Sequence, residues 1–211
     1  MSSLNGASAS SPAGSLASRT YLALVHFPVY DKNRKIVATS ITNLDIHDIA
    51  RSSKTYGLAA YFLVHPVAVQ RELAQRILGH WQGARGHEQN DFRSDALSIV
   101  RVADSIEQTV EQITFEHKAR PLIVATSACD TGKSVTSKRL LADPELQERP
   151  LLLVFGTGWG LTSEWSLGVD KFLCPVRGSA AYNHLSVRSA AGIILDRLFA
   201  QPESNSGEPS L

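Results

Sequence analysis

Short apolar runs alternate with helical patterns through most of this chain, and that alternation restricts the fold more than any other feature. Between residues 20 and 200 we expect strands at Tyr21–Phe27, Leu58–His65, Ser98–Val102, Leu122–Ser127, Leu151–Phe155 and Lys171–Cys174. These runs are rich in β-branched residues and are apolar on both faces, which is typical of buried parallel strands. The sequence therefore predicts an α/β fold in which helices cover a mostly parallel sheet of about six strands.

Helices are expected between these strands because apolar residues recur there at helical spacing. The first is expected over Asp45–Tyr56 and should end at Gly57, and the second should begin at Pro66. A capping box of Asp104 and Glu107 should begin the third, and the last should begin near Asn183, a good N-cap. The Gly- and charge-rich stretch 83–95 is expected to be a surface loop.

Composition bounds the class of protein but not its function. The 211 residues are 43% hydrophobic and 19% charged, which suits one domain over residues 20–200, with disordered tails at 1–19 and 201–211. A net charge of +1 means that any basic surface must be local. The two cysteines, Cys129 and Cys174, fit the reducing cytoplasm, and no apolar run approaches the ~20 residues of a membrane helix.

Three expected strand exits carry polar or Gly-rich residues, and ligands bind parallel sheets beyond the carboxyl ends of strands. In the first, LLLVFGTGWGL (151–161), glycines recur at Gly156, Gly158 and Gly160. Glycine permits positive φ and a close approach of the backbone to a ligand, whereas a plain turn rarely needs three. The spacing is not the G-x-G-x-x-G of dinucleotide-binding folds.

The other two exits are CPVRGSAAYNHLSV (174–187), which enters the last helix, and TSITNLDIHDIARSSKTYG (39–57), a polar loop feeding a helix that carries Arg51. The segments FGTGWGL and PVRGSAAYNHLSVRSAAGIILDRL resemble the second and third motifs of the SPOUT class of RNA methyltransferases, and IHDIARSSKTYG resembles their first. The resemblance covers most of residues 21–199 and is closest to an uncharacterised bacterial branch of that class.

This resemblance implies a C-terminal trefoil knot with S-adenosylmethionine bent between two loops, and a homodimer that packs through this region with RNA lying across both subunits. It implies one cofactor wall at Phe155, Gly156, Thr157, Gly158, Trp159, Gly160 and Leu161. It implies a second wall at Pro175, Val176, Arg177, Gly178, Asn183, Leu185 and Ser186. The activity expected is methyl transfer from S-adenosylmethionine to a nucleotide of tRNA or rRNA, giving S-adenosylhomocysteine.

Candidates for handling the acceptor proton also follow from the resemblance. Arg51 matches the arginine that ribose-methylating members use near the acceptor hydroxyl, and His184 and Asp45 are alternative bases. A positioned acid–base group typically contributes about 10²–10⁴-fold. The glutamate of the ribose methylators' second motif is replaced by Gly158 or Trp159, and their third motif also differs here, so the target atom stays open.

Alternative functions remain at this point. The departures from the SPOUT motifs leave open a binding module of the same fold that has lost catalysis. Ser127-x-x-x-x-Gly132-Lys133-Ser134 nearly spells a phosphate-binding loop and suggests a nucleotide hydrolase, although Ser127 stands where that turn needs glycine. Asp45-x-His47-Asp48 could suggest a metal site, but no partner cluster accompanies it, and helix capping is the better interpretation.

Overall fold

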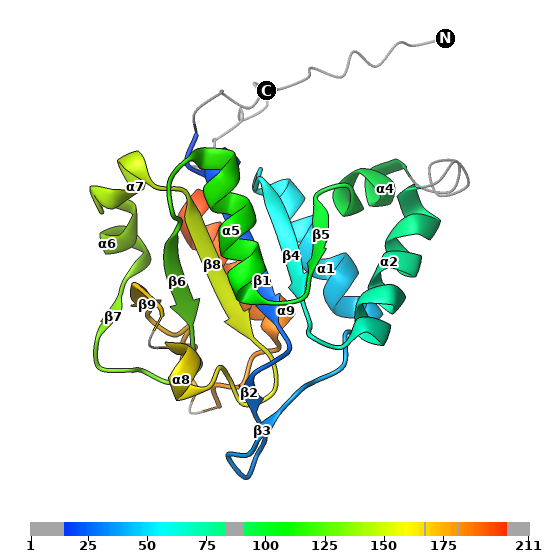
Figure 1. The fold of residues 1–211 in the computed structure, drawn as a ribbon. Coiled ribbons are helices and arrows are strands. Elements are labelled where there is room, and N and C mark those ends of the chain that lie inside the picture. The colour runs from blue at the N-terminus through cyan, green and yellow to red at the C-terminus, as the bar shows by residue number, and fades with distance from the viewer. Residues whose placement is uncertain (1–14, 83–90, 167, 181, 202–211) are drawn as a thin grey trace, which may run out of the picture.

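Parallel strands form the central sheet of the computed structural model, which describes residues 15–82, 91–166, 168–180 and 182–201 (Figure 1). The sheet has seven strands in the order β5-β4-β1-β8-β6-β9-β7. Their bounds are β1 Thr20–Val25, β4 Ala60–Val64, β5 Val100–Ala103, β6 Leu122–Thr126, β7 Ser134–Val135, β8 Leu151–Gly156 and β9 Lys171–Leu173. The predicted α/β class is confirmed, and β7 adds a short seventh strand.

Helices cover both faces of the sheet. One face is covered by α1 (Asn43–Thr55), α2 (Ala68–Gln82), α4 (Asp91–Leu97), α6 (Ser137–Leu141) and α9 (Val187–Phe199). The other face is covered by α5 (Ile106–His117) and α8 (Ser163–Ser166), and α5 lies in front of the sheet in Figure 1. Residues of the central strand β1 alternate between the two cores, with Leu22 and Leu24 on the first side and Ala23 and Val25 on the second.

A two-stranded hairpin interrupts the first β–α connection. Its strands are β2 (Val29–Tyr30) and β3 (Ile36–Val37), paired antiparallel. In Figure 1 the hairpin projects beyond the sheet edge toward which the strand arrows point. Sequence patterning did not predict it, because two-residue strands are too short to show a period of two.

The structure corrects three helix starts and one loop. The N-caps are Thr42 for α1, Ser105 for α5 and Ser186 for α9, each accepting a backbone N–H with its hydroxyl. The expected caps Asp104 and Asn183 therefore lie outside their helices, because nearby hydroxyl side chains serve as the caps instead. Part of the expected loop 83–95 is helix α4, and residues 83–90 lie outside the described residues.

Residues 15–19, expected in the N-terminal tail, form a short 3-10 turn (Ala17–Arg19). Leu16 packs against the core. The Arg19 guanidinium donates to the backbone carbonyl groups of Leu146 and Gln147, both in α7 (Glu145–Glu148). The remainder of both expected tails, apart from Gln201, lies outside the described residues. No helix in the described part of the chain is long and apolar enough to cross a membrane.

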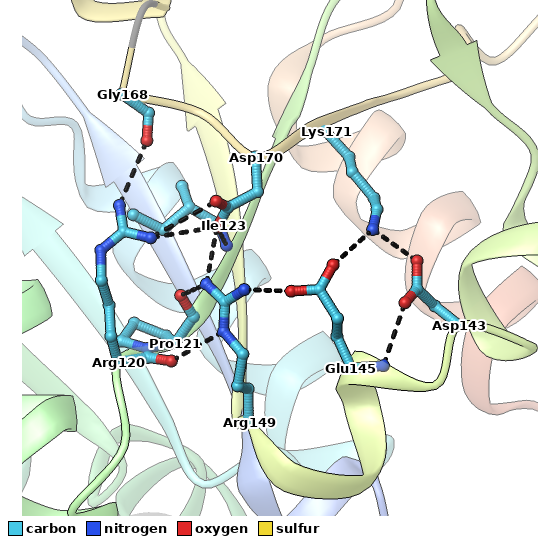
Figure 2. A network of polar contacts seen from close by, with 9 residues as sticks. All are labelled: Arg120, Pro121, Ile123, Asp143, Glu145, Arg149, Gly168, Asp170 and Lys171. Atoms are coloured by element: carbon cyan, nitrogen blue, oxygen red, sulfur yellow. Dashed lines mark hydrogen bonds and ion pairs between the residues drawn. The ribbon is translucent and has the colours of Figure 1, made fainter.

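A polar network fixes the start of β9 (Figure 2). Asp170 accepts a hydrogen bond from the backbone N–H of Ile123 at 2.8 Å and pairs with Arg149 at 2.9 Å and Arg120 at 3.2 Å. Lys171 bridges Asp143 and Glu145, and its hydrogen bond is the main reason that the pKa of each carboxyl is lowered. The network secures a strand of only three residues, from which the predicted second cofactor wall continues.

Candidate cofactor-binding and active site

The two predicted cofactor walls extend from the same edge of the sheet. β8 pairs with β6 and β6 pairs with β9, all in parallel, so the carboxyl ends of these strands lie together. The β8 exit loop is residues 156–161, and the β9 exit loop is residues 174–186. The β9 loop also contacts the segment after β6, since the Asn183 side-chain amide donates to the Ala128 carbonyl at 3.2 Å and the Cys174 N–H to Val135 at 2.8 Å.

Two glycines in the β8 exit loop have backbone conformations that other residues rarely adopt. Gly158 has φ +57° and Gly160 has φ +97°. A Cβ at Gly158 would also lie 2.8 Å from the carbonyl oxygen of Tyr30, and one at Gly156 would lie 2.9 Å from the backbone nitrogen of Leu161. Glycine is therefore required at 158 both by its φ and by the close approach of β2.

The hairpin holds this loop in shape through backbone hydrogen bonds. The Trp159 N–H donates to the Tyr30 carbonyl at 2.8 Å, and the Tyr30 N–H donates to the Gly160 carbonyl at 2.9 Å. Leu161 forms an isolated antiparallel bridge with Val29. The indole of Trp159 remains 63% exposed, so the loop presents backbone and an aromatic side chain at its surface.

The β9 exit loop offers backbone groups to a ligand. Pro175 is buried and Val176 packs against the core, whereas Arg177 and Gly178 are exposed. From Val176 to Leu185, excluding position 181, no backbone N–H donates a hydrogen bond to another described residue. Polar backbone groups without a partner in the chain must bind water or a ligand.

Arg51 does not face these loops within its own chain. On α1 it shares a face with His47 and Lys54, one turn away on either side. His47 packs edge-on against Trp81 of α2 at 5.6 Å, and Lys54 pairs with Asp95 of α4 at 2.9 Å. Arg51 itself is exposed on this face. The structure therefore places it beside α2 and α4, while the cofactor walls adjoin the N-terminal end of α9.

Asp45 faces α9 rather than solvent. It is 7% exposed, accepts a hydrogen bond from the Thr42 hydroxyl at 2.6 Å, and lies 3.4 Å from the Arg188 guanidinium. Asp48 also pairs with Arg188, at 3.3 Å. These contacts give Asp45 a capping and ion-pairing role. They also separate the members of the Asp45-x-His47-Asp48 motif, because His47 points toward α2 while both carboxylates point toward α9.

His184 is the candidate base that the structure places in a cofactor wall. It is exposed in the β9 exit loop, and its ring packs edge-on against Tyr182 at 5.4 Å. Next to it, Asn183 joins this loop to the segment after β6. The loop thus carries an exposed imidazole at the sheet edge from which both loops extend.

Sequence reasoning missed a buried histidine pair at the same sheet edge. His26 and His65 directly follow adjacent strands β1 and β4, are 0% and 2% exposed, and stack with ring centroids 5.7 Å apart. Each precedes a proline by one or two residues at a strand exit. A histidine just before a proline at two strand exits is the sequence pattern that could have identified the pair, given that β1 and β4 are neighbours.

The hydrogen bonds assign the tautomer of each ring. Thr157 donates its hydroxyl to the Val25 carbonyl at 3.2 Å, so Thr39 donates to Thr157, and His26 Nδ1–H donates to Thr39 at 3.0 Å. His65 donates Nε2–H to the Thr39 carbonyl and accepts from the Val67 N–H at Nδ1, both at 3.0 Å. The side chain of Thr157, in the predicted cofactor wall, is therefore held through Thr39 by a histidine that donates from Nδ1. His26 Nε2 is a buried acceptor with no partner in the described chain.

This pair makes stability depend on acidity. Burial, and then the neighbouring His65, lower the pKa of His26 from 6.5 to about 4. Between pH 6.5 and 4 the His26 imidazole is protonated in the unfolded chain but neutral in the folded chain. The free energy of unfolding therefore falls as the pH falls. We expect the free energy of unfolding, measured by urea denaturation, to drop by about 2 kcal/mol from pH 7 to pH 5 through His26 alone.

A His26→Gln variant should lose that part of the pH dependence, although it starts from a lower stability. His80→Gln, which replaces an exposed histidine of α2, is the matched control and should keep the wild-type pH slope. Equal slopes in the wild type and His26→Gln would contradict the assignment of a buried neutral imidazole at His26.

The segment that resembles a phosphate-binding loop has a different geometry. Lys133 and Ser134 lead into strand β7, whereas a phosphate-binding loop leads into a helix whose N-terminus faces the phosphates. Lys133 instead lines an open hollow of about 590 Å³ together with Arg139. The nucleotide-hydrolase alternative therefore loses its structural basis.

Comparison with known proteins identifies the family. Residues 19–200 match a family described as SAM-dependent RNA methyltransferase. A protein of Nitratidesulfovibrio vulgaris named "tRNA (guanine-N(1)-)-methyltransferase" is 44% identical over 199 residues, which cover 94% of this chain and 45% of the relative. An Aquifex aeolicus protein, named only "Uncharacterized protein", is 38% identical over 86% of this chain and 88% of its own length.

A solved structure shares the fold at low identity. The "Probable Methyltransferase" of Bordetella pertussis Tohama I has a TM-score of 0.57 at 17% identity, covering 88% of this chain and 95% of that one. The chain spans less than half the length of the first curated relative. With its parallel sheet and its two loops at one sheet edge, the chain belongs to the S-adenosylmethionine-dependent RNA methyltransferase family, as the SPOUT motifs predicted.

Proposed function

We propose that this chain transfers a methyl group from S-adenosylmethionine to a nucleotide of RNA, with tRNA favoured over rRNA. The observation that carries the proposal is that the β8 and β9 exit loops extend from the same sheet edge. One is shaped by positive-φ glycines, and in the other the backbone N–H groups of residues 176–185, position 181 aside, donate to no described residue. The family match over residues 19–200 supports the cofactor, and the printed name of the 44% identical relative supports tRNA.

The proposed cofactor contacts are mostly backbone. When bound, S-adenosylmethionine supplies an electrophilic methyl group on a sulfonium. The chain would hold it between Gly156–Leu161 and Pro175–Ser186, orient it, and exclude water, since proximity and alignment supply much of the rate of a two-reactant step. The acceptor proton would pass to a base, and we propose His184, which lies in the proposed wall, as the first candidate. Asp45 would have to leave its ion pair with Arg188 to act as a base, and Arg51, which does not face the loops of its own chain, would have to be brought to the acceptor.

The trefoil knot is part of the same proposal. β9 lies between β6 and β7, its exit loop bonds to the segment after β6 through Asn183, and α9 then returns to pack on α1 and β8. This path supports threading of the C-terminal segment through the β6–β7 connection.

The two cysteines are free, which agrees with the proposed cytoplasmic location.

We also propose a homodimer, as the resemblance to SPOUT methyltransferases implies. The wide apolar surface of α9 is covered within the chain by α1, α6 and β8. Support comes instead from Leu44 and Leu185, which are 57% and 47% exposed near the N-terminal ends of α1 and α9. These ends are joined through Arg188 and Asp45. Light scattering at micromolar concentration tests this, and a monomer would contradict it.

One experiment tests the function directly. Purified protein is incubated with methyl-labelled S-adenosylmethionine and unfractionated bacterial tRNA or rRNA, and the nucleosides are analysed by mass spectrometry. The same methylated nucleoside should be missing from RNA of a strain that lacks the gene. Label in rRNA alone would change the RNA class. Cofactor binding with no transfer to any cellular RNA would favour the non-catalytic binding module.

A further inference from the structure

We propose that the β2–β3 hairpin, residues 29–37, is an arm that holds the RNA backbone beside the methyl-donor loop, with Lys32, Arg34 and Lys35 contacting phosphates. This assignment rests on the proposed function and adds to it the surface by which RNA is held. A chain of net charge +1 needs a local basic surface to bind RNA, and the hairpin supplies three cations within four residues.

The hairpin tip keeps a net positive charge, because its three cations outnumber the one carboxylate, Asp31. Residues 32–36 are all exposed, and within the described residues neither lysine nor Arg34 has a carboxylate partner. Asp31, the acidic residue in the tip, is used internally, because its side chain accepts the N–H groups of Asn33 and Lys35 at 2.8 Å each. By contrast, Arg149 and Lys171 form ion pairs with Asp170 and Asp143 in the network of Figure 2.

One of the three cations is held in place before any ligand arrives. The Arg34 guanidinium stacks over the Tyr30 ring, 4.0 Å from its centroid. The Tyr30 hydroxyl is anchored in turn by the side chain and N–H of Ser163, at 3.0 and 3.2 Å. A planar guanidinium fixed over an aromatic ring can bind phosphate oxygens with two N–H groups while losing little further side-chain freedom.

The arm is joined rigidly to the site. Tyr30 exchanges backbone hydrogen bonds with Trp159 and Gly160, and Thr162 donates to the Pro28 carbonyl at 3.4 Å. An RNA backbone bound at the tip is thereby held next to the proposed cofactor wall. The exposed indole of Trp159 lies at this junction, and exposed aromatic side chains are surfaces on which unpaired bases stack. Cations beside an exposed aromatic favour RNA over an acidic protein as the occupant.

The test measures affinity for unfractionated bacterial tRNA at several salt concentrations. In a K32E/R34E/K35E variant the dissociation constant at 100 mM salt should rise at least tenfold, and the salt slope should fall by about 2, at roughly 0.7 per lost phosphate contact. K32Q/R34Q/K35Q should show a smaller loss in affinity with a similar fall in slope. Circular dichroism and thermal melting should stay at wild-type values in both variants.

The control carries the same change of charge elsewhere. R76E/K118E/R197E reverses three exposed cations on α2, after α5 and on α9, and should keep the dissociation constant within twofold. Wild-type affinity and slope in the hairpin variant would overturn the arm and leave the proposed function standing. A changed oligomer mass with unchanged tRNA affinity would overturn it in favour of a contact between protein chains. Wild-type protein that binds S-adenosylmethionine but not tRNA would overturn both the arm and tRNA as substrate.

Discussion

A Gly158→Val variant should lose affinity for S-adenosylmethionine on the order of 100-fold, because two penalties meet at one position. A β-branched residue is strained at φ +57°, and its Cβ would lie 2.8 Å from the Tyr30 carbonyl oxygen. The loop can relieve that contact only by moving away from the hairpin, which breaks the hydrogen bond from Trp159 to Tyr30. Calorimetric titration of the cofactor measures the loss.

The control is Gly79→Val on α2, where an added Cβ meets no atom within 4 Å and φ is not positive. It should bind the cofactor as the wild type does. Gly158→Ala has the same Cβ contact without β-branching and should fall between the two. If Gly158→Val melts like the wild type and binds with unchanged affinity, the β8 exit loop is not a cofactor wall.

The second large effect is expected at Arg51. Arg51 does not face the proposed walls of its own chain, so it reaches the acceptor only if RNA or a second subunit of the proposed dimer brings the two together. In that arrangement Arg51→Ala should lower methyl transfer at least ~10²-fold at saturating RNA while cofactor affinity stays near wild type. Arg51→Lys should not restore activity, because an ammonium cannot reproduce the planar fork of a guanidinium. The assay uses total cellular RNA with methyl-labelled cofactor.

Two other results are informative at this position. If Arg51 contacts only phosphate, RNA affinity falls, the salt slope drops by about one contact, and turnover at saturating RNA is spared. Arg76→Ala replaces another exposed helix arginine and should change neither quantity. Wild-type turnover in Arg51→Ala removes Arg51 from the catalytic candidates, and His184 becomes the residue to replace next.

The sequence predicted the sheet well because strands that are buried on both faces appear in it as short, continuous apolar runs. The expected strands at Leu122–Ser127 and Leu151–Phe155 correspond to β6 and β8 within one or two residues. Helix starts were less accurate, since Ser, Thr, Asn and Asp are all competent caps and only geometry selects among them. The choice of Ser186 over Asn183 lengthened the β9 exit loop by three residues relative to the expectation.

Glycine spacing and motif order are visible in the sequence and predict the two cofactor walls, and the structure places both loops at one edge of the sheet. The histidine pair was not predicted, because His26 and His65 lie 39 positions apart and become neighbours only when β1 and β4 pair. The orientation of Arg51 was also hidden, since the side of α1 that meets α9 depends on where the C-terminal segment returns to the sheet. Local patterns specify strands and turns, whereas contacts across the sheet come from topology.

The charged network behind β9 makes salt act on this protein in two places. β9 pairs over three residues with β6 and two with β7, and the ion pairs of Asp170 and Lys171 add to its attachment. Their side chains are partly exposed, and dissolved ions weaken such pairs. Raising ionic strength therefore weakens the ion pairs that attach β9, from which the proposed second cofactor wall extends. It also weakens the proposed contacts with RNA. A titration of RNA affinity against salt measures both processes unless cofactor affinity is followed alongside.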